Sequence, residues 1–340
     1  MTHPSEPRPA APASTRWQRT VYFLIQDLGI AFALLLITLV FALSAPYFAT
    51  SGNFLKIFVQ IAINTVLAAG MTFVILIGGI DLSVGSVLAL STVVGALIMT
   101  NPALPVGLAI PLATLACMGV GALCGFINGY VAERWKVPSF IVTLGMLNIA
   151  SGAARVISKN STITGLPKSF TDFGTLIIGG VIPTIFLIAI GIIFIGWIIL
   201  RFTVFGRFIV AIGTNEEAVR LSGHNPRTYK IAAFMLSGLM AGVGGMVYLL
   251  RLNVGSPIAG SGYELNAIAA VIIGGTSLSG GKGSIIGTLI GACILQVLNT
   301  GLQLLGVGDN FKPIVIGMVV VFAVIIDTYR ERYLRTLELR

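Results

Sequence analysis

Residues 82–132 read LSVGSVLALSTVVGALIMTNPALPVGLAIPLATLACMGVGALCGFINGYVA, without a single charged side chain. A helix needs roughly 20 apolar residues to cross ~30 Å of hydrocarbon, so this run is long enough for two crossings. Pro102 and Pro105 divide it, because proline cannot donate a backbone hydrogen bond and disfavours helix in the residue before it. The run therefore predicts two membrane-spanning helices joined by a short connection.

The shortage of charge extends over the whole chain. Of 340 residues only 10% are charged and 56% are hydrophobic, with a mean hydropathy of +0.97. A water-soluble domain carries about a quarter charged residues. The long unbroken apolar runs also differ from the ten-residue alternation of a membrane β-barrel. The composition predicts an all-α, polytopic membrane protein.

Charge-free runs predict ten membrane-spanning helices. They cover residues 24–44, 57–77, 82–99, 107–131, 138–157, 181–200, 231–250, 264–279, 284–305 and 313–329. We expect a transmembrane domain over 24–329 with tails at 1–23 and 330–340. The first run is expected to remain as an anchor, because the segment before it is long and no small-x-small cleavage site follows. Three cysteines lie within predicted spans, so no disulfide is expected.

Basic residues indicate how the spans are oriented, because short cytoplasmic loops are enriched in Lys and Arg. Ten spans place both termini on one side. On that side lie Arg8, Arg16, Arg19, Arg134, Lys136, Arg201, Arg207, Arg220, Arg227, Lys230, Arg330, Arg332, Arg335 and Arg340. The opposite side has fewer, namely Lys56, Arg155, Lys159, Lys168, Arg251 and Lys312. Both termini are therefore expected in the cytoplasm, and the net charge of +9 is explained by insertion and anionic lipid rather than by nucleic acid.

The longest cytoplasmic connection, 201–230, is expected to contain a helix of about two turns. Thr214 or Asn215 can cap its N-terminus, Glu216 and Glu217 favour the first turn, and Gly223 can end it. So short a helix is unstable alone in water. It must pack against the membrane helices or fit a groove of a partner protein, unless it is only a structured connector.

Two glycine-rich segments resemble each other at an offset of 196 residues. They are Ile77-Gly-Gly-Ile-Asp-Leu-Ser-Val-Gly85 and Ile273-Gly-Gly-Thr-Ser-Leu-Ser-Gly-Gly281. Irregular backbone at membrane depth survives only where protein or a water-filled cavity satisfies it, and transporters often place such breaks in both halves. The repeat favours a role in a path or gate. The alternative is a pair of ordinary turns at cytoplasmic helix ends.

Polar side chains in or beside the spans are few. The ionisable ones are Asp81 and Glu264; the uncharged ones are Asn64, Thr65, Thr72, Asn128, Thr143, Asn148, Asn266, Thr276, Ser277, Gln296, Asn299 and Gln303. Such groups suit a neutral, hydroxyl-rich solute. Their alternative role is hydrogen bonding between helices, worth about 1 kcal/mol or less each.

Several kinds of site are excluded by the residues present. Around Gly281-Lys282, a phosphate-binding loop would need glycine where Thr276 stands and Ser or Thr where Gly283 stands. The two histidines lie outside the predicted spans, so a histidine-based metal centre in the membrane lacks ligands. We expect no catalytic residue, no metal and no cofactor, and any dependence on ATP must come from a partner.

Three longer segments resemble a known family, the permease subunits of bacterial importers of ribose and other monosaccharides that belong to the ATP-binding-cassette (ABC) class. The segments are 69–86, 213–223 and 263–283, and the resemblance extends over about 40–327. It implies a homodimer of ten-helix permeases in the inner membrane, with a cytoplasmic ATPase and a periplasmic sugar-binding protein. Residues 217–223 resemble the ATPase-docking pattern Glu-Ala-Ala-x-x-x-Gly, with Val219 in place of the second Ala. We expect this similar apolar residue to preserve the docking surface.

The expected sites follow from these patterns and this resemblance. The ATPase-coupling element should include Gly213, Asn215, Glu216, Glu217, Ala218, Arg220, Leu221 and Gly223. The path or gate should include Asn64, Thr72, Asp81, Ser83, Glu264, Asn266, Thr276, Ser277 and Ser279. The mechanism implied is alternating access, in which ATP hydrolysis by the partner moves the coupling loop and thereby the helices around a polar passage.

Two alternatives stay open. One is a secondary transporter driven by ions, which would want a titratable relay, whereas Asp81 and Glu264 have no obvious partner. The other is an ABC permease for another cargo, such as nucleosides or branched-chain amino acids. Ribose is the favoured cargo because the resemblance is greatest to ribose permeases.

Overall fold

The computed structural model describes residues 16–308, 310–319, 321–322 and 325. The helices are α1 (Arg16–Ser44), α2 (Ser51–Leu76), α3 (Val84–Met99), α4 (Val106–Trp135), α5 (Ser139–Ile157), α6 (Lys168–Thr175), α7 (Thr184–Phe202), α8 (Val204–Leu221), α9 (Pro226–Leu252), α10 (Tyr263–Ile273) and α11 (Ile285–Leu304). The strands β1 (Ile177–Ile178) and β2 (Ile182–Pro183) pair antiparallel. Residues 312–319, 321–322 and 325 are also helical.

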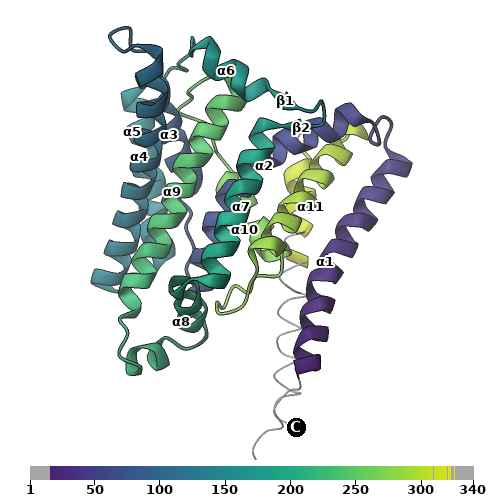
Figure 1. Ribbon diagram of the computed structural model, residues 1–340, viewed down its shortest axis with the longest axis vertical. Helices are drawn as coiled ribbons and strands as arrows, with labels where there is room; N and C mark the ends of the chain where they lie inside the picture. The colour runs from purple at the N-terminus through teal and green to yellow at the C-terminus, as the bar shows by residue number, and fades with distance from the viewer. Residues whose placement is uncertain (1–15, 309, 320, 323–324, 326–340) are drawn as a thin grey trace, which may run out of the picture.

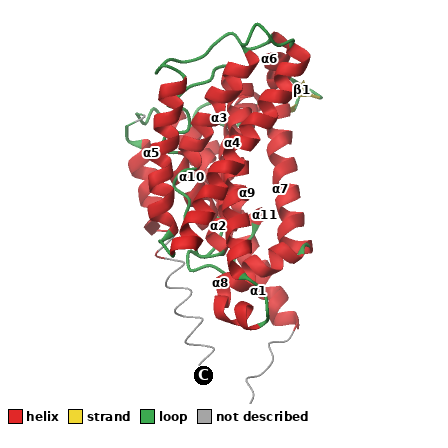
Figure 2. Cartoon of the chain, turned by 90° about the vertical axis from the view of Figure 1, so that its left-hand side faces the viewer, coloured by secondary structure: helices red, strands yellow, loops and turns green. Residues whose placement is uncertain are grey.

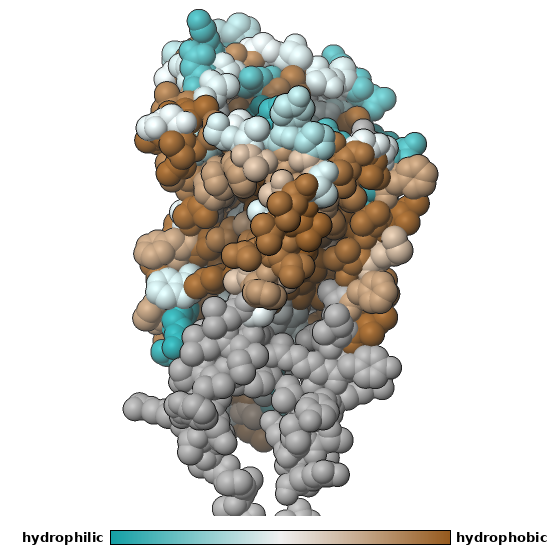
Figure 3. All heavy atoms as spheres, turned by 90° about the vertical axis from the view of Figure 1, so that its right-hand side faces the viewer, coloured by the Kyte–Doolittle hydropathy of each residue, from teal (hydrophilic) through white to brown (hydrophobic). Residues whose placement is uncertain are grey.

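Most helices run side by side along the long axis of the molecule, with α6 at one end and α8 at the other (Figures 1 and 2). Six of them, α2, α4, α5, α7, α9 and α11, are long and apolar enough to cross a membrane. A band of hydrophobic residues lies below a polar cap on the face shown in Figure 3. The prediction of an all-α, polytopic membrane protein is confirmed.

The predicted spans coincide with helices, and their ends differ. The helix of the first span begins eight residues early, at Arg16, and the tenth span falls on the helical residues that begin at 312. Residues 1–15 and 326–340, which include most of the predicted N-terminal tail and all of the C-terminal one, lie outside the described residues. Helix α6 and the β1–β2 hairpin have no counterpart in the prediction.

The eighth predicted span, 264–279, departs most from the structure. Helix α10 ends at Ile273 because Gly275 adopts φ +82°, and the Thr276 N–H donates to the Val271 carbonyl at 3.1 Å. Such a glycine-ended cap stops a helix regardless of how apolar the following residues are.

The segment before α10, residues 253–262, is largely non-helical and lies along α3. A Cβ on Gly255 would lie 2.7 Å from the Thr92 carbonyl oxygen, and the Ser256 N–H donates to the Thr92 hydroxyl at 3.3 Å. Gly260 has φ +75° and packs on the Gly85 backbone. This stretch of broken backbone is therefore covered by protein, as backbone at membrane depth requires.

Helices α4 and α9 form the closest helix pair. A Cβ on Gly121 would collide with the Gly238 carbonyl, and one on Gly242 with the Cys117 carbonyl. Glycine at these positions lets the two backbones touch, which is how helices associate where the surrounding lipid offers no hydrophobic driving force. Helix α2 is the most buried of the six long apolar helices and lies between this pair and α10–α11.

Candidate functional site

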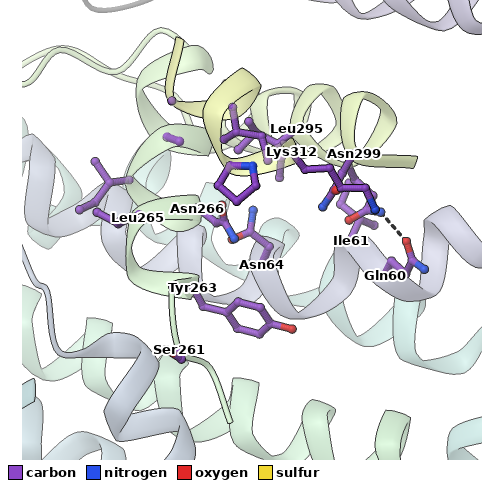
Figure 4. Close-up of a pocket in the computed structure, with 18 of the residues that line it drawn as sticks. Gln60, Ile61, Asn64, Ser261, Tyr263, Leu265, Asn266, Leu295, Asn299 and Lys312 are labelled. Carbon is purple, nitrogen blue, oxygen red and sulfur yellow. Dashed lines mark hydrogen bonds between the residues drawn. The ribbon is translucent and has the colours of Figure 1, made fainter. Parts of the chain in front are cut away.

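A cavity of about 880 Å³ lies between α2, α10, α11 and the helical residues from 312 onward (Figure 4). It is lined by Gln60, Ile61, Asn64, Arg251, Ser261, Gly262, Tyr263, Leu265, Asn266, Ile268, Ala269, Ala292, Leu295, Gln296, Asn299, Gln303, Lys312, Pro313, Ile316, Gly317 and Val321. The volume falls in the range of small-molecule sites, which combine apolar walls with a few placed polar groups.

Six carboxamide side chains give this cavity its chemistry. They are Gln60, Asn64, Asn266, Gln296, Asn299 and Gln303. The Gln296 amide donates to the Gln60 carbonyl oxygen and, at 3.0 Å, to the Thr300 hydroxyl. The buried Asn64 Oδ1 has no hydrogen-bond partner. Because each carboxamide both donates and accepts hydrogen bonds, this lining can bind the hydroxyl groups of a solute either as donors or as acceptors.

The charged groups of the cavity wall are Arg251 and Lys312, and no Asp or Glu is among the described residues that line it. Such a lining disfavours a cationic solute. Tyr263 adds an aromatic face, which can cover the apolar side of a small ring while its hydroxyl stays polar. Together these groups fit a neutral, hydroxyl-rich molecule.

The broken stretch before α10 reaches the cavity. Ser261, Gly262 and Tyr263, which lie at the start of α10, form part of the wall. Gly262 has φ +84°, and its N–H donates to the Glu264 carboxylate at 3.2 Å. Discontinuous helices line the substrate sites of many transporters, because their ends expose backbone groups to the passage.

Two of the nine residues expected in the path line this cavity, namely Asn64 and Asn266. Glu264 lies in the first turn of α10 without being part of the wall. The Thr72 hydroxyl lies 2.8 Å from that of Thr288, linking α2 to α11 inside the core. Ser277 and Ser279 contact each other at 2.9 Å in the loop after α10, and the buried Thr276 hydroxyl has no partner.

Asp81 and Ser83 belong to a separate, closed cluster. Asp81 is 1% exposed. Its Oδ1 accepts from the Ser83 N–H at 3.0 Å and hydroxyl at 2.6 Å, and its Oδ2 accepts from the Ser237 hydroxyl at 3.0 Å. The Asn128 amide donates to the Ser83 hydroxyl at 2.9 Å. The cluster joins the α2–α3 connection to α4 and α9, and none of its members lines the cavity.

The two glycine-rich segments end their helices in the same way. After α2, Gly78 has φ +74° and the Gly79 N–H donates to the Val74 carbonyl at 2.9 Å; after α10, Gly275 and Thr276 repeat that arrangement. Structurally equivalent residues of the two segments are thus 197 positions apart, whereas the sequence alignment gives an offset of 196. The second loop is longer, because α11 starts only at Ile285.

Helix α8 contains seven of the eight expected coupling residues, and Gly223 lies just after it. It bends at Asn215 (φ −159°, ψ 95°), whose side chain accepts from the Ala218 N–H at 3.0 Å, and Gly223 follows with φ +85°. The expected two-turn helix is therefore present, preceded by a further helical part over 204–214 that the prediction missed. That part is rich in β-branched and aromatic residues, which favour helix little by themselves.

Most of the segment from Thr214 to Asn225 is exposed, and only Val219 in it is buried. Val219 packs in a cluster with Ile209 and Ile212 of the same helix. The Val219 side chain, which replaces the Ala of the docking pattern, is therefore buried inside the permease and is not part of the exposed surface. The exposed residues include Glu217, Arg220 and Leu221, with a 2.7 Å ion pair between Glu217 and Arg220.

The sequence analysis named Gln296, Asn299 and Gln303 as groups that suit a hydroxyl-rich solute but did not assign them to the path, and it did not name Gln60. The spacing of these residues carries a further signal. Gln296, Asn299 and Gln303 recur at helical spacing, as do Gln60 and Asn64, so each set lies on one helix face. No periodic pattern marks four further residues of the wall, which are Arg251 in the last turn of α9, Ser261 in the broken stretch, Tyr263 at the start of α10 and Lys312 in the last helical stretch.

Comparisons with known proteins agree with one another. The family described as branched-chain amino acid transport system / permease component matches residues 53–325. The chain is 42% identical to the ribose import permease protein RbsC of Escherichia coli (strain K12), over 92% of this chain and 96% of that protein. It is 41% identical to RbsC of Bacillus subtilis (91% and 96%) and 37% identical to the fructose import permease protein FrcC of Rhizobium meliloti (86% and 84%). No solved structure gives a significant match.

Proposed function

The chain belongs to the family of branched-chain amino acid transport system permease components, and we propose that it is the permease subunit of an ABC importer for a monosaccharide, ribose in the first place. The observation that carries this proposal is the cavity, whose described lining residues include six carboxamides and a tyrosine and no acidic group. Ribose is favoured among sugars because the two RbsC proteins are more similar to this chain than the fructose permease.

The proposed partners are a cytoplasmic ATPase, a periplasmic sugar-binding protein, a second copy of the permease and membrane lipid. The exposed face of α8 supports ATPase docking, since it combines two charged side chains with the apolar Leu221. Helix α5 supports a helix-to-helix dimer contact or lipid contact, since most of its surface is exposed and apolar, as at Phe140, Leu144 and Ile149. The homodimer is also implied by the family resemblance.

We propose that α8 and both termini face the cytoplasm. The basic residues of the predicted inner side support this orientation. Arg207 lies in α8 itself, and Arg134, Lys136, Arg201 and Lys230 lie at or near the ends of α4, α7 and α9. The cavity, which is walled by Arg251 and Lys312 of the predicted outer side, then lies toward the periplasm and is placed to receive sugar from a binding protein.

The mechanism proposed is alternating access. ATP binding and hydrolysis in the partner move α8, and this motion shifts the helices around the cavity so that it closes to the outside and opens to the cytoplasm. The permease itself needs to bind sugar only weakly, because tight binding in the cavity would slow release.

The test is uptake of labelled ribose in cells that carry the permease with its ATPase and binding protein. The double variant Glu217→Arg, Gly223→Trp should insert normally yet be silent, because it alters the exposed face of α8. Asp172→Arg, on the exposed surface of α6 at the opposite end, is the control and should transport normally.

Uptake that persists without the ATPase and follows the proton gradient would contradict the proposal. ATP-dependent uptake of another sugar in place of ribose would correct the cargo alone.

A further inference from the structure

The glycine-rich loops of the two halves meet at one residue of α8. A Cβ added to Gly213 would collide with the Leu76 carbonyl, at the end of α2, and with the Gly281 amide, in the loop between α10 and α11. Gly213 lies two residues before the bend at Asn215. The coupling helix therefore touches both loops by backbone, with no side chain in between.

The two loops are also joined to each other. The Gly281 N–H donates to the Leu76 carbonyl at 2.8 Å. Gly280 has φ +84°, and a Cβ there would lie 2.9 Å from both the Gly78 nitrogen and the Leu76 carbonyl oxygen. Closely packed backbone cannot deform gradually, so a displacement of one member must move the others or break the contact.

The helices that enter and leave these loops carry the cavity wall. Helix α2, which ends at the first loop, supplies Gln60 and Asn64; α10 and α11, on either side of the second loop, supply Asn266 and Asn299. The contact at Gly213 is thus connected to all three helices that contribute carboxamides.

The part of α8 after the bend has a different attachment. The Lys230 ammonium of α9 lies 2.7 Å from Glu216 and 3.3 Å from Glu133 of α4. This ion-paired group ties the second part of α8 to the α4–α9 pair. The bend at Asn215 therefore separates a part bound to the cavity-bearing loops from a part bound to the rigid glycine-packed pair.

We propose that Gly213 is a positioning residue for transport. Because its backbone contacts both loops, a motion of α8 displaces the α2–α3 and α10–α11 loops together. This inference rests on the proposed function. In this proposal the two glycine-rich loops transmit the motion of α8 to the helices and do not line the path. Asn215 then serves as the hinge between the second part of α8, which carries the exposed face proposed to dock the ATPase, and the first part, which contacts both loops.

The test compares Gly213→Ala with Gly191→Ala, a change in a helical glycine of α7 that has no atom within 4 Å of its Cβ position. Gly213→Ala should still bind the ATPase in a pull-down, because the exposed face of α8 is unchanged. Its ribose uptake and its ribose-stimulated ATPase activity should fall at least about ten-fold, as expected from overpacking of a tight contact. Gly191→Ala should behave as the wild type.

Normal uptake by an assembled Gly213→Ala complex would overturn the inference. If neither the wild type nor Gly191→Ala transports ribose, the proposed function fails instead.

A second measurement uses the wild-type complex and covers the case in which Gly213→Ala does not fold. Amide hydrogen exchange is followed without nucleotide and with ATP plus vanadate. We expect exchange in peptides covering 76–80 and 278–283 to change together with that of 208–214, because the Gly281 N–H depends on the shared contact. A change in 208–214 without one in both loops, or no change in any of the three, would overturn the inference.

Discussion

The Asp81 cluster and the carboxamide-lined cavity are both polar regions inside an apolar bundle, and they differ in where their hydrogen bonds go. Both Asp81 carboxylate oxygens accept from protein hydroxyl or amide groups, and the side chain is 1% exposed. In the cavity, six carboxamide side chains line a hollow of about 880 Å³ instead of a closed cluster.

The difference teaches how to separate structural from functional polarity in a membrane protein. A polar group whose capacity is used by the protein holds helices together. A polar group that lines a cavity is available to a solute. Charge is a poor guide here, since the buried acid belongs to the first class and neutral amides form the second.

The largest effect on stability is expected for Asp81→Ala. The change leaves the Ser83 and Ser237 donors without their acceptor, at an expected cost of about 2–4 kcal/mol in the free energy of unfolding. Thermal unfolding of the detergent-solubilised protein should show a clearly lower midpoint. The exposed Asp172→Ala is the matched control and should shift it little. An Asp81→Ala protein with normal stability and no uptake would place Asp81 in the path and break the comparison.

A substitution in the cavity wall should impair uptake and leave the stability of the protein unchanged. Asn299→Leu removes a carboxamide that lines the hollow, so the concentration of sugar needed for half-maximal uptake should rise about ten-fold. The unfolding midpoint should stay near that of the wild type, because the lost group faces the cavity. Equal loss of stability and uptake would mean that Asn299 is a structural residue.

The smallest effect is expected for Thr72→Val. Hydrogen bonds between membrane helices contribute about 1 kcal/mol or less, and the Thr288 hydroxyl keeps an acceptor in the Ser284 carbonyl at 3.1 Å. Uptake should stay within about two-fold of the wild type, and stability should fall slightly. Complete loss of transport by a stable Thr72→Val protein would return this residue to the path.

Much of the fold could be predicted from the sequence, because long charge-free runs leave few alternatives to helices in a membrane. The runs located nine helices over the described residues and the last helical stretch from 312 onward. The break at 253–262 could not be predicted, since it depends on Gly255 and Gly260 packing against α3, a contact between distant parts of the chain. The same break hid Ser261 and Tyr263 from the prediction.

The candidate site could be predicted only in part. Asn64 and Asn266 were selected as polar groups in apolar spans, and they do line the cavity. Asp81 and Ser83 were selected on the same ground and lie in the closed cluster. Sequence shows that a polar side chain is present, whereas its free hydrogen-bonding capacity depends on neighbours such as Ser237, which is 156 positions away.

The most direct test of the account is labelling of single cysteines by a membrane-impermeant thiol reagent. Asn299→Cys and Ser237→Cys are made in a background in which the three native cysteines are replaced by alanine, and the permease is assembled with its ATPase and binding protein. We predict that Asn299→Cys reacts, that ribose with the binding protein slows this reaction, and that Ser237→Cys stays unreactive. A reaction at position 299 that ribose leaves unchanged, or equal reaction at both positions, would contradict the assignment of the cavity to the sugar.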